Sequence, residues 1–288
     1  MAKTTADLLA SISKIAAIPV AQNTFSNADI LDIASDCVET EILPTLLQAR
    51  QDFYVVMETV TTSTAAGEIY PSFRIPHRAV GQSIIGVYDA STDDPIDPRR
   101  YWVEGSKILF DIGSQSTYRI RYYLRPSRMV ETSEAGLITS IDRVTGVIGL
   151  SAIPATFLTS VVCDFIRARA GSDTLGTDKT ITAIDDVAPD YSVTFAPADI
   201  PTDLAVGDYV TLSEETPVPQ VPVEWISFMS YWVANNLLEE LGDTDAAKVI
   251  AVRLKRLETK ALSLVQPRVE AKSKAILRPY TSRRNRYW

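Results

Sequence analysis

The sequence predicts an α+β fold in which an α-helical bundle is interrupted by an inserted antiparallel β-sandwich or barrel-like domain and followed by an extended C-terminal arm. Apolar residues recur at helical three- and four-residue spacing in residues 1–52 and again in residues 219–266. Residues 53–218 are instead rich in β-branched residues and tyrosine, and are punctuated by Gly, Pro, Asn and Asp. Residues 267–288 are basic and carry no such period. A chain of 288 residues is long enough for about two domains.

Two helices of the bundle are expected in residues 1–52. The first covers residues 5–17. Ser26 or Asn27 caps a longer second helix, in which Pro44 introduces a kink without ending the apolar period. The apolar positions are Leu8, Leu9, Ile12 and Ile15 in the first helix, and Ile30, Ile33, Ala34, Cys37, Val38 and Ile42 in the second.

The inserted β domain is expected over residues 53–218. Turn signals recur every eight to twelve residues, which is typical of a sandwich or small barrel. The strict alternation in Tyr118–Tyr123 predicts a half-buried strand. The strand candidates are Phe53–Thr62, Ile69–Ile75, Ser83–Asp89, Ile108–Asp111, Tyr118–Leu124, Gly136–Ile141, Val147–Leu150, Lys179–Asp185, Tyr191–Phe195 and Tyr209–Leu212.

A helix pair is expected in residues 219–266, beginning at Pro222. Gly242 ends the first helix, and Asp243 or Thr244 caps the second. Because neither helical segment of the chain can bury its apolar stripe alone, both should pack together in one bundle. The stripes are Trp225, Ile226, Met229, Trp232, Val233, Leu237 and Leu241, then Ala247, Ile250, Leu254, Leu257, Ala261, Leu264 and Val265.

Residues 267–288 form the predicted partner-binding arm. The arm holds seven basic residues and one acid, Glu270, and so carries about +6 in a chain whose net charge is −8. Its aromatic residues have little use in water and are typical of interfaces, although a solvated tail is the alternative. The residues expected to bind the partner are Arg268, Lys272, Lys274, Ile276, Leu277, Arg278, Tyr280, Arg283, Arg284, Arg286, Tyr287 and Trp288.

The sequence contains no recognisable catalytic, cofactor or metal signature. The single histidine is His77. The sequence has no Gly-x-Ser-x-Gly motif to supply a serine nucleophile for it to activate, so a surface or packing role is expected. Residues 171–176 have the glycine spacing of a phosphate loop, but the following lysine comes too late, which predicts a loop or turn. Acid clusters at residues 93–97 and 185–186 lack the spacing of a calcium loop. A carboxylate pair that meets only in space stays open, yet no residue selects one, so we expect a protein that is not an enzyme.

Composition and cysteine usage indicate a soluble protein made in a reducing cytoplasm. Hydrophobic residues make up 46% and charged residues 22% of the chain. Cys37 and Cys163 are expected to be reduced thiols, with Cys37 on the apolar face of its helix. No apolar run reaches the roughly 20 residues of a membrane span, and the N-terminus lacks the pattern of a signal peptide.

Five short sequence segments stand out, and they follow one another along the chain from Ser26 to the late helix pair. They are Ser26–Leu31 continuing through Ile42–Tyr54, Tyr70–Gly81, Arg121–Pro126, Val206–Val210 and Pro219–Trp225. This order, together with the helix–β–helix–arm layout, resembles the head-to-tail adaptor (connector) proteins of tailed bacteriophages, particularly short-tailed ones. The resemblance covers the chain from about Ser26 to its end.

The resemblance implies a structural virion protein at the head–tail junction, synthesised in the host cytoplasm. Such adaptors form a homo-oligomeric ring, typically of twelve copies, below the portal protein, which their C-terminal arms bind. The helical bundle would then contact neighbouring copies, and the β domain would face outward or toward tail nozzle, hub or fibre proteins. DNA would pass through the channel without sequence-specific binding. A fully extended arm of this length reaches roughly 70 Å, enough to cross a neighbouring subunit.

Two other classes of function remain as alternatives. A DNA-binding module using the basic tail predicts affinity that falls steeply with salt. A β-rich tail or receptor-binding protein acting on surface glycans would need aromatic residues clustered with paired acids, which the sequence does not show.

Overall fold

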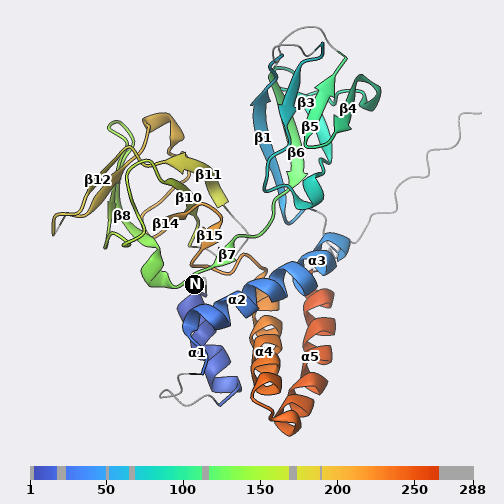
Figure 1. Ribbon diagram of the computed structural model, residues 1–288, viewed down its shortest axis with the longest axis vertical. Helices are drawn as coiled ribbons and strands as arrows, with labels where there is room; N and C mark the ends of the chain where they lie inside the picture. Colours follow the sequence, from blue (N-terminus) through green and yellow to red (C-terminus); the bar gives the residue numbers. More distant parts are fainter. Residues whose placement is uncertain are drawn as a thin grey trace, which may run out of the picture.

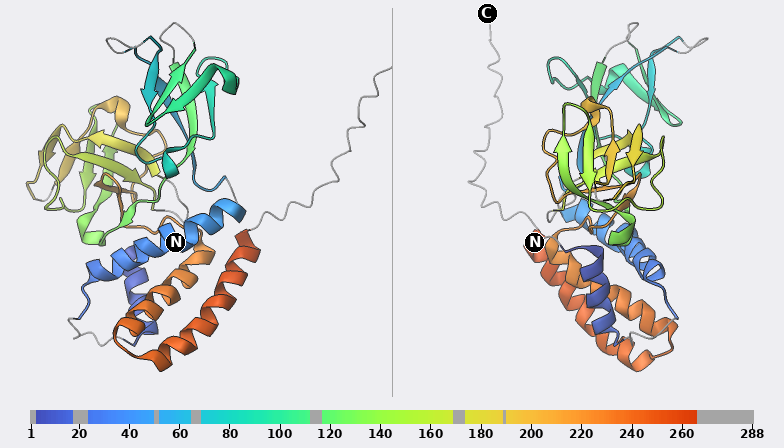
Figure 2. Two further views of the ribbon diagram at one scale, coloured as in Figure 1. Left: turned by 45° about the vertical axis from the view of Figure 1, so that its right-hand side comes forward. Right: turned by 90° about the vertical axis from the view of Figure 1, so that its left-hand side faces the viewer.

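The computed structural model describes residues 3–17, 24–49, 52–64, 69–111, 117–168, 174–188 and 190–265. It confirms the α+β class, since helices from both ends of the chain form one bundle and the residues between them form antiparallel sheets. Figures 1 and 2 show two β lobes standing on the same end of this helical bundle.

The bundle is organised around α4 (Val223–Glu240), which packs on α1 (Thr5–Ile15), α2 (Asn27–Cys37) and α5 (Thr244–Val265). Its buried core draws on all of these helices and on α3 (Leu43–Ala49). The expected Ser26 cap is confirmed, because Ser26 and Asp29 form a reciprocal capping box at the start of α2. Asp243 caps α5, with its Oδ1 atom accepting a hydrogen bond from the backbone N–H of Ala246 at 3.1 Å.

The second helix continues through Pro44, as the apolar period predicts. A π-helical turn (Val38–Ile42) separates α2 from α3, and the N–H of Leu43 bonds to the carbonyl of Val38, five residues back. Proline has no N–H and its ring crowds the carbonyl four residues earlier, so a wider turn before Pro44 relieves that clash. Ile42 and Leu46 stay fully buried on either side of the proline.

The first β lobe spans residues 53–124 and is a small sandwich. One sheet has the order β1–β6–β3 and the other β2–β5–β4, and all neighbours are antiparallel. The predicted alternation is confirmed in β6, where Tyr118, Ile120 and Tyr122 are buried. The rings of Phe110 and Tyr118 stack at 4.3 Å between centroids and join the two sheets. The strands are β1 (Val55–Thr61), β2 (Ser72–Arg74), β3 (Gly86–Asp89), β4 (Tyr101–Glu104), β5 (Lys107–Phe110) and β6 (Thr117–Tyr123).

The second β lobe spans residues 128–216 and has a separate hydrophobic core. Its main sheet runs in the order β11–β10–β14–β8–β9–β13–β12. A short parallel pair, β7 (Arg128–Met129) with β15 (Glu215–Thr216), lies where the lobe meets the bundle. The sheet strands are β8 (Gly136–Asp142), β9 (Val147–Leu150), β10 (Val162–Ile166), β11 (Thr174–Thr180), β12 (Ala183–Asp185), β13 (Ser192–Thr194) and β14 (Tyr209–Leu212). Four 3-10 turns complete the described elements of the two lobes: Val80–Gln82, Pro98–Arg100, Thr132–Glu134 and Pro197–Asp199.

The structure differs from the sequence-based expectation in several places. The strands β4, β7, β10 and β15 are not among the expected strands, and three further differences concern residues for which another arrangement is expected. Residues 53–218 hold two cores instead of one, and the described strands of neither lobe close into a barrel. The strand expected over Lys179–Asp185 is divided at Ile181, which is buried and turns the chain from β11 into β12. Of the loop expected over residues 171–176, residues 174–176 belong to β11, because they pair with β10 through a bulge.

Candidate interaction surfaces

The predicted partner-binding arm, with its twelve binding residues from Arg268 to Trp288, lies outside the described residues. Its base is described. Helix α5 ends at Val265, which is 7% exposed and belongs to the same buried cluster as Leu46 of α3. The arm therefore begins two residues after a side chain that is buried in the core of the bundle.

The groups that could perform chemistry are dispersed in the described part of the chain. Nε2 of His77 lies 3.0 Å from Oε1 of Glu214, and the histidine side chain is 63% exposed, in accord with the expected surface role. Burial raises the pKa of the Cys163 thiol to about 12 and also raises the pKa of Cys37, so neither is a ready nucleophile. Among these residues no group of three or more His, Cys, Asp or Glu side chains is placed to hold a metal ion.

None of the described helices is both long enough and apolar enough to span a lipid bilayer.

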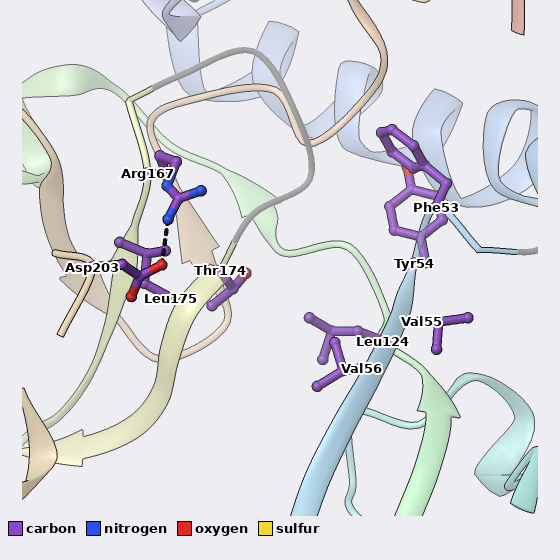
Figure 3. Close-up of a pocket in the computed structure, with 9 residues that line it drawn as sticks. All are labelled: Phe53, Tyr54, Val55, Val56, Leu124, Arg167, Thr174, Leu175 and Asp203. Atoms are coloured by element: carbon purple, nitrogen blue, oxygen red, sulfur yellow. Dashed lines mark hydrogen bonds and ion pairs between the residues drawn. The ribbon is translucent and has the colours of Figure 1, made fainter. Parts of the chain in front are cut away.

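A cleft separates the two β lobes (Figure 3). Two adjoining cavities of about 340 and 450 Å³ share Val56, Leu124, Thr174 and Leu175 as lining residues, so they form one continuous space between β1 and β11. Both strands are edge strands of their sheets. The cations on the second lobe's wall are already paired, Arg167 with Asp203 and Lys179 with Asp199. The cleft therefore offers strand edges and neutralised charges instead of a reactive cluster.

Arg78 and Asp164 connect the two lobes through a buried ion pair. Nη2 of Arg78 lies 2.7 Å from Oδ2 of Asp164, with the side chains 4% and 0% exposed. The same Nη2 donates to Oγ of Ser213 at 2.9 Å, and the backbone N–H groups of Asp178 and Glu214 donate to the two oxygens of Asp164 at 3.0 Å each. Burial raises the pKa of Asp164, and the Arg78 charge opposes that rise. This network holds the first lobe against the second.

An acidic stripe runs along α2 and into the π-helical turn. We define the acidic stripe as Asp29, Asp32, Asp36 and Glu39, whose 3–4–3 spacing places them on one helical face, opposite the buried residues Ile30, Ala34 and Cys37. Residues 27–49 contain no Lys or Arg. Asp32 forms a bidentate pair with Arg128 at 2.7 and 2.8 Å, whereas Asp36 and Glu39 form no ion pair with a described residue.

A basic groove of about 550 Å³ lies between α1, α4 and α5. Lys3 and Lys14 rim one side, and Arg253 rims the other, where its guanidinium lies 4.5 Å from the ring centroid of Tyr231. Neither lysine pairs with an acid in the described ranges. We define the basic groove by its lining residues: Lys3, Ser11, Lys14, Ile15, Ser227, Ser230, Tyr231, Val249, Ile250 and Arg253.

Compared with models of known protein families the chain matches none, and a comparison with curated proteins also gives no match.

The sequence pattern indicates the arm but contains no sign of the groove or of the Arg78–Asp164 ion pair. The acidic stripe could have been found, because residues 27–49 hold five acids and no base. The groove could not, because Lys14 and Arg253 stand far apart in the chain and meet only when α1 and α5 flank α4.

Proposed function

We propose that this protein is a ring-forming adaptor of the head-to-tail junction of a tailed bacteriophage. In this role it is a structural component of the virion and not an enzyme. Copies surround the DNA channel, the C-terminal arm of residues 267–288 binds the portal protein above, and the β lobes offer a platform to tail proteins below.

The observation that carries this proposal is the way the bundle holds the base of the arm. Val265 is buried in the same core cluster as Leu43 and Leu46 of α3, two residues before Pro267, where the cationic and aromatic segment begins. An arm with a fixed base and a contact-rich end is suited to reach across to another polypeptide. Many such arms in one ring gain strength by effective concentration, so each contact can be weak alone.

The charge division of the chain also supports the proposal. The arm carries about +6 in a chain of net charge −8, so the remaining residues sum to about −14. An acidic body repels the DNA phosphates and therefore suits a channel through which DNA slides. Lys and Arg side chains on the channel wall would instead bind the phosphates in a salt-dependent way and retard the DNA.

The test compares the full chain with a chain ending at Pro267 by native mass spectrometry, each alone and mixed with the portal protein of the virus that encodes it. We expect the full chain to bind the portal ring and the shortened chain to lose that binding while keeping its own assembly state and melting temperature. Changing Tyr280, Tyr287 and Trp288 to serine leaves the charge of the arm unchanged. This variant should bind the portal more weakly and keep its assembly state and melting temperature. Undiminished binding by the shortened chain would overturn the proposal.

A further inference from the structure

The outer surface of α5 is the least covered part of the bundle. Helix α5 packs chiefly on α4, and its far side carries Val249 and Val252, which are 73% and 71% exposed. Exposed basic residues accompany them at helical spacing, namely Lys255, Arg256 and Lys260, none paired with an acid of the described chain. Val249 also lines the basic groove, so groove and helix surface form one continuous cationic and apolar face.

The acidic stripe is the matching surface on the same molecule. Asp36 and Glu39 are exposed and unpaired within the described residues, and they border cavities lined by the short segment from Arg125 to Arg128. Arg128 is occupied by Asp32, and exposed Arg125 lines the cavity beside Glu39. The four carboxylates of the stripe thus lie near these two exposed arginines and keep an excess of negative charge. One face is therefore mainly cationic, with no acid among the residues that line the groove and with Asp245 of α5 paired to Lys248, and the other is anionic.

The two faces lie on opposite sides of α4. Met229 and Val233 of α4 belong to the core that contains α2, while Ser227 and Tyr231 line the groove. Residues two positions apart on a helix are rotated by about 200°, so these pairs face in opposite directions. A protein with complementary surfaces on opposite sides associates head to tail, and a head-to-tail contact that closes gives a ring.

We propose that the basic groove, together with the outward surface of α5, binds the acidic stripe of a second copy of this chain. The contact rests on the proposed ring-forming function and specifies the faces that neighbouring copies use. Lys3, Lys14 and Arg253 meet the carboxylates of Asp36 and Glu39, and Val249 and Val252 become covered. Because the charges are surface charges, salt weakens the association.

The test uses two charge-reversed chains. The first carries Asp36→Lys and Glu39→Lys, and the second carries Lys3→Glu and Lys14→Glu. Each is examined alone and in equimolar mixture by sedimentation velocity and native mass spectrometry. A matched control carries Asp185→Lys and Asp186→Lys on β12 and the turn after it, both exposed and far along the chain from either face. Circular dichroism and melting temperature verify that every variant is folded.

We expect the wild-type chain and the control to self-associate, and each reversed chain to associate at least about tenfold more weakly, since like charges now face one another. The equimolar mixture should recover assembly with the two chains alternating at 1:1 stoichiometry, because every contact again pairs opposite charges.

The outcomes separate this inference from the adaptor function. A closed wild-type ring that neither reversal weakens overturns the inference and leaves the adaptor proposal standing. In another outcome, both reversals abolish assembly and mixing restores it, but only open oligomers form. That result supports the two faces as the contact and contradicts the proposed ring. A monomeric wild-type chain overturns the inference, as does retention of a duplex DNA fragment by the groove in place of a second copy.

Discussion

Nη2 of Arg78, in the first β lobe, lies 2.7 Å from Oδ2 of Asp164 on β10 of the second lobe, and both side chains are buried. Asp164 also accepts two backbone hydrogen bonds, from Asp178 and Glu214. The Asp164 carboxylate is thus neutralised by a guanidinium from the first lobe, and each of its oxygens accepts a backbone hydrogen bond from the second lobe. Removing the guanidinium alone would leave a buried charge without its partner.

We therefore predict that Arg78→Met lowers the free energy of unfolding by about 3–5 kcal/mol, the usual cost of breaking a buried pair from one side. Urea titration followed by circular dichroism measures the loss. Arg119→Met is the matched control, because its pair with Asp93 is largely exposed and should cost less than about 1 kcal/mol. Adding Asp164→Asn to Arg78→Met should recover part of the loss, because the amide is uncharged and its oxygen still accepts one of the two backbone hydrogen bonds. Equal effects of the two arginine variants would contradict the prediction.

The same pair explains why β10 is hard to find in the sequence. Val162–Ile166 is buried almost throughout as a strand in the middle of its sheet, so it shows no alternation, and Asp164 interrupts its apolar run. The carboxylate is tolerated only because Arg78 arrives from another lobe, and no local pattern contains that information. By contrast, β9 (Val147–Leu150) and β14 (Tyr209–Leu212) match their predicted bounds, since turn residues flank a short apolar run.

Helix ends were predictable because their signals are local. Ser26 and Asp29 stand three residues apart and form the capping box whatever the rest of the chain does. The candidate interaction surfaces depend instead on contacts between residues that are far apart in the sequence. Lys14 and Arg253 share a groove only through the packing of α1 and α5 on α4, which the periodicity of each helix does not specify.

Ser26→Ala should destabilise the protein by about 1 kcal/mol, the typical cost of losing a helix N-cap. Hydrogen bonds from Ser26 lower the pKa of Asp29, so the stabilisation from its carboxylate is full above the ordinary value of 3.8 and is lost as pH falls through the lowered folded value. In Ser26→Ala the pKa of Asp29 should rise toward its ordinary value, as NMR titration of the carboxyl carbon would record. Thr40→Ala, which removes a hydroxyl inside the helix, should leave that pKa unchanged. An unaltered Asp29 titration in the Ser26 variant would refute the cap.

Both cysteines should be unreactive in the folded protein. Burial raises the pKa of Cys163 to about 12, so at pH 8 only about one thiol in ten thousand is the reactive thiolate, and burial protects Cys37 likewise. With Ellman's reagent we expect no rapid release of the coloured thiolate from native protein and two equivalents in denaturant. Val144→Cys, at a position 87% exposed, should add one fast equivalent and serves as the control. A fast native equivalent in the unaltered chain would show that a thiol is accessible.

Gly146→Ala should be among the most damaging small substitutions in the second lobe. Gly146 ends the turn between β8 and β9 with φ of +80°, and a Cβ atom there would lie 2.1 Å from the carbonyl oxygen of Phe195. That oxygen belongs to the backbone, and the Phe195 N–H donates to the carbonyl of Gly146, so neither chain can move without losing the contact. Gly105→Ala is the matched control, because φ is +59° there and a Cβ meets nothing within 4 Å. The control should lose only the roughly 1–2 kcal/mol of a left-handed residue, and Gly146→Ala should lose clearly more in the same urea titration. Equal losses would mean that the β8–β9 turn and the backbone at Phe195 move apart to accommodate the added methyl group.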